Sequence, residues 1–484
     1  MPGRSLDDLM QGYNEVPYVS VPDPARHPER LATIGTLLGL DVAPVATCRV
    51  LEFACGDGSN LVPIAATLPN ASFVGFDFAA RPLARAQSMV RDLALDNIRL
   101  LHLDLRDLPD DLGQFDYIIA TGLYSWLPDD VRDRLMPAIA RRLAPHGVAF
   151  VNYNTMPGCH LRAVVWDMLR HHTRAIPDAP AKLAAARALL KLVGTPVAHD
   201  NTSQQALRAE VQSVAAASDA GLVHDDLAPF NAAVYFHEFA ADATRAGLAY
   251  LAEAHLGTMI AGDVDTDVRQ ALGKLDRLAR EQYLDFVHFR RFRESLLCRA
   301  DASSRFVVDP ARVLGLHAVA SLALRRANAQ PAASGSDSDP IRRQLLARWP
   351  ASIPVTELAQ SLAQQASTSA DGASIAARVT ELYVAGLIDL RSAPARVATR
   401  AGERPEAFAA ARWLCRDRDV IPSLYHEALR YPDPLARSLL ALLDGTHTRN
   451  ELANALGGPF AGAGGRAKLD RALDVLAGKA LLVR

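Results

Sequence analysis

The stretch VLEFACGDGSN, residues 50–60, decides the fold of this chain of 484 residues. An apolar run reaches Glu52 and passes into a turn that holds Gly56 and Gly58, and Asn60 follows at the start of a helix-like stretch. Such a turn either binds a nucleotide-like cofactor or simply connects a strand to a helix. The turn alone does not separate these two interpretations, so the neighbouring sequence has to decide.

Short apolar runs alternate with helix-like stretches from about residue 48 to residue 154. The runs RVLEF, SFVGFD, IRLLHLD, FDYIIATG and GVAFVNYN are rich in Val, Ile and Phe, and the stretches between them carry apolar residues at helical spacing. This order predicts an α/β fold with a doubly wound, Rossmann-like parallel sheet. Ligands in such sheets bind at the carboxyl ends of the strands.

Three acidic residues stand at the ends of successive predicted strands: Glu52, Asp77 and Asp104. A carboxylate such as Asp77, at the end of the second strand, typically accepts two hydrogen bonds from a ribose diol. Asp104 is placed to accept from the exocyclic amine of an adenine. Glu52 is placed to orient the turn or to meet a cationic end of the ligand. A single acid at this position often only caps the next helix, but three in register with the turn predict a nucleoside cofactor.

The turn favours S-adenosylmethionine over a dinucleotide. The dinucleotide fingerprint requires a third glycine inside the helix, whereas Gly58 is followed by Ser59, Asn60 and Leu61. Asp57 lies within the turn, where it would repel a pyrophosphate. A sulfonium compound without phosphate suits these acids better.

On these residues the chain resembles the class I methyltransferases. GLYSWLPDDVRDRL (122–135), NYNTMPGCH (152–160), LAYLAEA (248–254) and EQYLDFVHFRRFRESLLCR (281–299) are similar to the bacterial members that carry a methyltransferase regulatory domain. That group includes rickettsial enzymes that methylate lysines of outer-membrane proteins. The resemblance therefore implies a protein substrate with a lysine acceptor. Methylation of a small metabolite, or a regulatory protein that binds the cofactor without turnover, are the alternatives.

The resemblance and the strand-end pattern together assign the cofactor site. The expected cofactor-binding residues are Tyr18, Glu52, Ala54, Gly56, Gly58, Asn60, Asp77, Phe78, Asp104, Leu105 and Thr121. Two of them depart from the family pattern. Ala54 replaces the first glycine of the turn, and Thr121 stands before Gly122 where similar proteins have a histidine.

Residues after the fourth and fifth predicted strands are the candidates for the acceptor side. Tyr124 could accept a hydrogen bond from the amine and Trp126 could form a wall or a cation–π surface. Asn152, Tyr153 and Asn154 could position the nucleophile. The alternative for Tyr124 and Trp126 is plain packing.

The rest of the chain divides into four further units. Residues 1–45 form an amino-terminal arm in which Tyr13 and Tyr18 belong either to a lid or to a packing arm, and residues 46–158 form the methyltransferase core. An Ala- and Leu-rich helical middle domain follows at 159–305, and two winged-helix-like modules at 306–400 and 401–484. The stretch 325–340 is small and polar and is predicted to be a linker.

The two winged-helix-like modules favour protein docking or dimerisation over nucleic-acid binding, and a homodimer is one form of that expectation. Residues 341–484 carry a surplus of only about five basic groups, without a dense basic stripe that would neutralise phosphates. Arg290, Arg291 and Arg293 are expected to form a solvated or salt-bridged edge, with anion recognition as the alternative.

Composition argues against a membrane protein, a secreted protein and a metal-binding protein. The net charge is -2, half of the residues are hydrophobic, and no apolar run reaches the ~18 residues of a membrane span. The first residues lack the features of a signal peptide, which predicts a cytoplasmic protein without membrane insertion. The five cysteines have no metal-ligand spacing. His224, Asp225, Asp226, His237 and Glu238 are interpreted as structural residues, so no metal site is expected.

Overall fold

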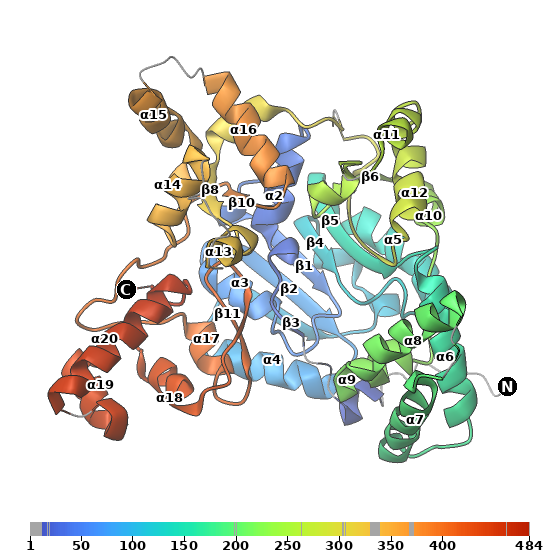
Figure 1. Ribbon diagram of the computed structural model, residues 1–484, viewed down its shortest axis with the longest axis horizontal. Helices are drawn as coiled ribbons and strands as arrows, with labels where there is room; N and C mark the ends of the chain where they lie inside the picture. The colour runs from blue at the N-terminus through green and yellow to red at the C-terminus, as the bar shows by residue number, and fades with distance from the viewer. Residues whose placement is uncertain are drawn as a thin grey trace.

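The computed structural model describes residues 12–483 except 17, 19, 198, 200, 263, 303, 305, 330–338, 367–371 and 461. Most of the predicted linker at 325–340 and the first part of the amino-terminal arm therefore lie outside the described residues. Figure 1 shows a central sheet with helices around it, and the carboxy-terminal modules lie at one side of that sheet.

The central sheet has seven strands in the order β3-β2-β1-β4-β5-β7-β6. The five strands nearest the amino terminus are parallel: β1 (Arg49–Phe53), β2 (Ser72–Asp77), β3 (Ile98–His102), β4 (Phe115–Ala120) and β5 (Leu143–Asn154). The connecting helices are α3 (Leu61–Thr67), α4 (Ala80–Asp92) and α5 (Asp129–Arg142). Four residues of β1 are completely or almost completely buried, as expected for a strand covered on both faces. This arrangement confirms the predicted doubly wound fold.

The structure differs from the prediction of an all-helical middle region. β6 (Leu248–Glu253) and β7 (Phe292–Arg299) extend the central sheet by antiparallel pairing, with β7 directly beside β5. The LAYLAE sequence of β6 favours a helix by local propensity. Its burial beside β7 decides the conformation instead, because strand preference depends strongly on tertiary packing.

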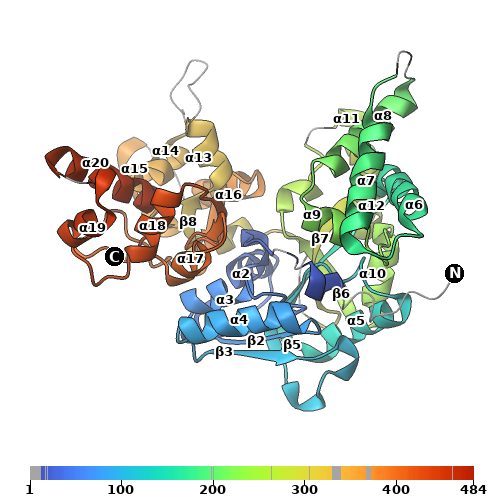
Figure 2. The same ribbon diagram turned by 90° about the horizontal axis from the view of Figure 1, so that it is seen from below.

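The remaining middle region is helical and has a small core of its own. α6 (Cys159–Thr173), α7 (Ala179–Gly194) and α8 (Thr202–Ala215) enclose apolar residues such as Leu169, Leu190 and Val211. Figure 2 shows these helices standing above one end of the sheet. The chain returns through α9 (Asp219–Gly221) and the π-helical turn η5 (Leu222–Asp226) to α10 (Phe236–Arg245), α11 (Thr266–Gly273) and α12 (Arg277–His288).

The first carboxy-terminal module contains a three-stranded sheet in the order β10-β8-β9. Its elements are β8 (His317–Ala320), α13 (Leu322–Ala329), α14 (Pro340–Arg348), β9 (Ile353–Pro354), α15 (Val355–Ala366), α16 (Gly372–Val384) and β10 (Ile388–Arg391). Helix α2 (Pro28–Leu37) of the amino-terminal arm lies between this module and the central sheet, and all three share one hydrophobic cluster. The Arg30 guanidinium pairs with Asp389 at 2.6 Å.

The second carboxy-terminal module packs on the methyltransferase core. It consists of α17 (Ala409–Leu414), β11 (Val420–Pro422), β12 (Ala428–Arg430), α18 (Pro434–Leu442), α19 (Arg449–Leu456) and α20 (Gly462–Gly478). Its hydrophobic cluster includes Val62 of α3 and Met89 of α4. Both modules therefore belong to one packed body with the core (Figure 2).

Candidate functional site

The glycine turn follows β1 and carries three left-handed residues. Ala54, Gly56 and Gly58 have φ of 53°, 54° and 73°. A Cβ on Gly58 would approach the Ala86 Cβ to 2.8 Å, so Gly58 lets the turn lie close to α4 and does not line the cavity. Ala54 adopts the left-handed conformation at a cost of about 1–2 kcal/mol. Ala54, which stands where the family pattern has its first glycine, therefore introduces local backbone strain.

Glu52 is the penultimate residue of β1 and is almost completely buried. Its Oε1 accepts a hydrogen bond from Asn60 Nδ2 at 2.8 Å, while its Oε2 has no partner among the described residues. Burial raises the pKa of Glu52 to about 8, although the bond from Asn60 acts against this. Such a group is suited to a cationic partner, which would compensate its buried charge.

Asp77, at the end of β2, holds the turn and faces the cavity. Its Oδ2 accepts from the Gly56 N–H at 2.8 Å and its Oδ1 from the Ala79 N–H at 2.7 Å. Burial raises the pKa of Asp77, and these two bonds oppose the shift. Each carboxylate oxygen has a second acceptor direction free for a ligand.

The second carboxy-terminal module reaches the back of the glycine turn. Arg418 binds the Asp57 carboxylate and donates to Ser59 Oγ at 2.7 Å. His426 Nε2 lies 2.9 Å from Asn60 Oδ1. The turn is thus held from two sides, by Asp77 and by a module that is more than 300 residues away in the sequence.

A cavity of about 470 Å³ opens at the carboxyl ends of β1, β2, β4 and β5, a volume typical of ligand sites. Eleven of the predicted site residues line it: Tyr18, Glu52, Ala54, Gly56, Asn60, Asp77, Phe78, Thr121, Trp126, Asn152 and Asn154. Thr121 Oγ1 and Trp126 Nε1, like Glu52 Oε2, are buried without a hydrogen-bond partner in the described part of the chain. Unpaired buried polar atoms around one cavity indicate a polar ligand.

A smaller cavity adjoins the large one and contains the third strand-end acid. Asp104 and Leu105 line it together with Ala54, Asp77 and Phe78. Arg106 donates to both oxygens of Asp104, from Nε at 3.0 Å and from Nη2 at 2.8 Å. An adenine amine would therefore share this carboxylate with Arg106.

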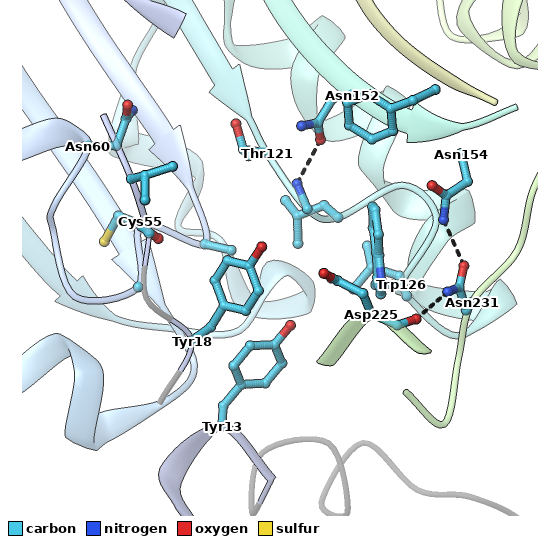
Figure 3. Close-up of a pocket in the computed structure, with 18 of the residues that line it drawn as sticks. Tyr13, Tyr18, Cys55, Asn60, Thr121, Trp126, Asn152, Asn154, Asp225 and Asn231 are labelled. Carbon is cyan, nitrogen blue, oxygen red and sulfur yellow. Dashed lines mark hydrogen bonds between the residues drawn. The ribbon is translucent and has the colours of Figure 1, made fainter. Parts of the chain in front are cut away.

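The far end of the large cavity is lined by an indole and several side-chain amides. Figure 3 shows Trp126, Asn152, Asn154 and Asn231 on this side, opposite Asn60. Asn152 Oδ1 accepts from the Gly122 N–H at 2.8 Å, and Asn154 Nδ2 donates to Asn231 Oδ1 at 2.8 Å. These bonds fix the amide planes and their orientation toward the cavity.

Tyr124 and Tyr153, expected on the acceptor side, do not line the cavity. The Tyr124 hydroxyl donates to the Asp242 carboxylate. The Tyr153 ring stacks on Phe239, with centroids 4.0 Å apart, and its hydroxyl lies 3.3 Å from Ser295 Oγ. Both tyrosines are buried in a hydrophobic cluster that includes Phe239 of α10, because α10 covers the face to which they point.

The amino-terminal arm closes one side of the cavity. Tyr13, Tyr18 and Arg26 all line it, and Figure 3 shows both tyrosine hydroxyls directed into the space. The Tyr13 ring stacks on His224 with centroids 4.3 Å apart, which joins the arm to η5. The position of Tyr13 and Tyr18 in the cavity wall supports the interpretation of the arm as a lid. The stacking of Tyr13 on His224 supports its interpretation as a packing arm.

The arginines at 290–293 are a buried ion-pair cluster more than a solvated edge. Arg293 is fully buried and pairs with Glu253 Oε1 at 2.5 Å and with Asp285 Oδ1 at 2.8 Å. Arg290 adds a contact of 3.1 Å to Asp285. Arg291, in contrast, lines the cavity. The salt-bridged interpretation is confirmed, and the solvated one is wrong for Arg293.

The remaining expectations from the sequence concern metal binding, the cysteines and membrane spans. Among the described residues, no group of three or more His, Cys, Asp or Glu side chains is placed to hold a metal ion. The five cysteines are buried and free. No helix within the described ranges is both long and apolar enough to cross a membrane.

Three models of known protein families match parts of this chain. Residues 50–147 match the model of a methyltransferase domain, and residues 218–299 match that of a predicted methyltransferase regulatory domain. Residues 403–462 match the C-terminal winged helix domain of PKMT. An uncharacterized protein of Rickettsia prowazekii (strain Madrid E) is 32% identical over 228 residues, which are 47% of this chain and 91% of that protein.

The chain belongs to the S-adenosylmethionine-dependent methyltransferases that carry a methyltransferase regulatory domain. A second uncharacterized protein of the same Rickettsia strain is 38% identical over 291 residues. That match covers 60% of this chain and 53% of the relative, so the chain spans about half the length of that protein. The predicted family and cofactor are confirmed.

A solved structure shares the whole architecture. PKMT2 from Rickettsia typhi superposes with a TM-score of 0.84 at 22% identity, covering 96% of this chain and 100% of that one. A further structure of that protein, in complex with AdoHcy, covers 97% of this chain with the same TM-score and identity. At this identity the likeness establishes the fold.

Sequence reasoning missed several residues of the methyltransferase site. Arg26, Asp225, Asn231 and Phe292 line the cavity but lie in the arm and in the regulatory region, far from the strand-end motifs. From the sequence alone, Asp225 is interpreted as a structural residue. An alternation of apolar runs gives no signal for such residues, because their position depends on tertiary packing.

Proposed function

We propose that this protein transfers a methyl group from S-adenosylmethionine to the side-chain amine of a lysine in another bacterial protein. The observation that carries the proposal is the composition of the cavity. A carboxylate-lined cofactor end passes directly into an end lined by Trp126, Asn152, Asn154 and two further carboxylates. An indole with amides and a carboxylate suits a cationic amine on an aliphatic stem.

The cofactor end has a partner for each part of the cofactor. The Asp77 carboxylate would accept from the ribose hydroxyls, and Asp104 and Leu105 would border the adenine. Glu52 and Arg26 would meet the ammonium and the carboxylate of the methionine part. The unpaired Glu52 Oε2 and Arg26 Nε support this fit. When bound, the cofactor supplies an electrophilic methyl group on a positively charged sulfur.

The acceptor end has to favour a neutral amine. A free lysine near pKa 10.4 must lose about three units to be half neutral at physiological pH, which costs about 4 kcal/mol. Desolvation in this cavity contributes to that shift. Trp126 stabilises the cationic form on entry, and the fixed amides of Asn152 and Asn154 direct the nitrogen toward the cofactor. Tyr13 and Tyr18 would exclude water.

The relatives support a protein acceptor and a role for the carboxy-terminal modules. The architecture shared with PKMT2, a name that denotes a protein lysine methyltransferase, favours lysine. We assign substrate-protein recognition to the exposed surfaces of the two modules. An envelope or outer-membrane protein as acceptor, a cytoplasmic location for the reaction, a homodimer and the absence of nucleic-acid binding stay predictions.

The decisive experiment uses labelled S-adenosylmethionine with the purified protein, bacterial envelope proteins and a small-molecule extract as parallel acceptors, followed by acid hydrolysis. Label recovered as methyl-lysine is the expected result. Label only in small molecules would make the protein a metabolite methyltransferase. Cofactor binding without any label in either pool would favour the regulatory alternative.

A further inference from the structure

Asp225 and Asp226 are adjacent acids in the regulatory region with opposite surroundings. Asp226 Oδ1 accepts from Arg162 Nε at 2.7 Å and from Trp166 Nε1 at 2.9 Å, and its Oδ2 accepts from Arg162 Nη2 at 3.0 Å. The Asp225 carboxylate has no hydrogen bond to any described residue, although it lines the cavity. Figure 3 shows it directed into the space between Tyr18 and Trp126.

The backbone of Asp225 is held firmly. Asp225 lies in the π-helical turn η5, a conformation that often occurs at functional sites. Its carbonyl oxygen accepts from Asn231 Nδ2 at 2.6 Å, and Asn231 Oδ1 accepts from Asn154 at the end of β5. His224 binds the Val16 carbonyl of the amino-terminal arm. The free carboxylate is thus presented to the cavity by an anchored turn.

The charged and titratable groups around Asp225 come from three elements. Asp226 follows it in η5, Arg162 approaches from α6, and Tyr13 and Tyr18 approach from the arm. Burial raises the pKa of Asp225 to about 7, Asp226 adds to the shift, and Arg162 opposes it. Burial also raises the pKa of Asp226, although Arg162 and Trp166 oppose that shift. A carboxylate with a raised pKa that lines a cavity is typical of acid–base groups in active sites.

We propose that the Asp225 carboxylate binds the ammonium group of the acceptor lysine and takes its proton before methyl transfer. This inference rests on the proposed function and assigns to the regulatory region a catalytic residue of the same cavity. The Asp226 carboxylate keeps Arg162 paired, which leaves the negative charge of Asp225 available for the ammonium group.

The reaction balances with the residues at hand. The lysine ammonium gives one proton to Asp225, which becomes neutral. The nitrogen lone pair then forms the N–C bond to the methyl carbon, while the C–S bond breaks and its electron pair stays on sulfur. The product is a methylated ammonium and a neutral thioether, and the proton on Asp225 leaves to solvent through the open side of the cavity.

The first test measures amine binding without turnover. We expect the wild-type protein, saturated with S-adenosylhomocysteine, to bind n-butylamine, and Asp225→Asn to weaken this binding about tenfold or more. The affinity of the variant for S-adenosylhomocysteine should stay unchanged in calorimetry. Asp219→Asn is the matched control, because Asp219 belongs to the same segment but its side chain is 66% exposed and pairs with Arg187.

Three results of this test would overturn the proposal. These are no measurable amine binding by the wild-type protein, equal amine binding by Asp225→Asn, or an equal loss of S-adenosylhomocysteine affinity, which would make Asp225 a cofactor ligand. Asn has the size of Asp, so the fold should survive, and circular dichroism checks this.

The second test measures the pH dependence of methyl transfer to the acceptor found for the wild-type protein. The wild-type rate should fall as the pH drops through about 7, because a protonated Asp225 cannot take the proton. Asp225→Asn should lower kcat by about 10²–10⁴-fold and remove this limb of the profile. An unchanged profile would overturn the role of Asp225.

The two proposals fail in different ways. Label in a small amine, combined with the expected Asp225→Asn defects, would refute the lysine-protein acceptor and keep Asp225 as the proton acceptor. Label in methyl-lysine with a fully active Asp225→Asn would do the reverse.

Discussion

The two ends of the cavity are built in different ways. Most residues of the proposed cofactor end come from one continuous segment, from Glu52 to Leu105, and lie at or just after the carboxyl ends of parallel strands. The acceptor end combines Trp126 after β4, Asn152 in β5 and Asp225 in η5. Local strand-end motifs therefore supply most of the proposed cofactor end, whereas the proposed acceptor end exists only after the regulatory region has packed against the core.

Arg293→Met should have the largest effect and should break the acceptor end selectively. The substitution leaves Glu253, Glu281 and Asp285 buried with only Arg290 nearby, which costs about 3–5 kcal/mol of stability. Denaturant unfolding measures the loss. Arg299→Met in the same strand is the control. Its partner Asp301 is 70% exposed, so the expected change is below about 1 kcal/mol. Equal effects would mean that the Arg293 cluster does not hold this region.

Asp77→Asn should break the cofactor end. The variant loses the charge that strengthens hydrogen bonds from the ribose hydroxyls, each worth about 1.5–3 kcal/mol, so the affinity for S-adenosylhomocysteine should fall about tenfold or more. Calorimetry measures the change, with the exposed Asp96→Asn as control. Unchanged affinity in a folded Asp77→Asn variant would refute the ribose assignment.

Arg418→Ala tests whether the second carboxy-terminal module belongs to the cofactor end. The buried Asp57 would lose its cation, which costs about 1–3 kcal/mol, and the loosened turn should weaken cofactor binding. Asp417→Asn removes an ion pair across the same interface, Arg85 with Asp417 at 2.7 Å, without touching the turn. If both variants bind the cofactor equally well, the module supports the fold alone.

Tyr124→Phe should have the smallest effect. It removes one hydrogen bond to Asp242 and keeps the ring, so we expect about 1 kcal/mol less stability. The transfer rate should not change, because the hydroxyl points away from the cavity. A tenfold lower rate in an equally stable variant would instead support the sequence-based assignment of Tyr124 to the acceptor side.

Most of the residues that the sequence assigned to the cofactor line the two adjoining cavities, because strand-end acids and a glycine turn follow from local rules. The same rules failed for β6 and β7, whose Ala, Leu and Arg residues favour helices or solvent by local preference and become strands only beside β5. They also failed for Tyr124 and Tyr153, because α10 covers the face to which these side chains point. The position of Asp225 depends on Asn231, which accepts a hydrogen bond from Asn154 across 77 residues of sequence. The periodicity of the sequence gives no sign of such contacts.

One paired measurement tests the central claim that a locally encoded cofactor end meets an acceptor end completed by the regulatory region. S-adenosylhomocysteine affinity and the single-turnover methyl-transfer rate at saturating cofactor would be determined for Asp77→Asn and Asp225→Asn. We predict that Asp77→Asn loses affinity and keeps most of its rate, whereas Asp225→Asn keeps affinity and loses its rate. Loss of both quantities in both variants would contradict the division of the cavity into two ends.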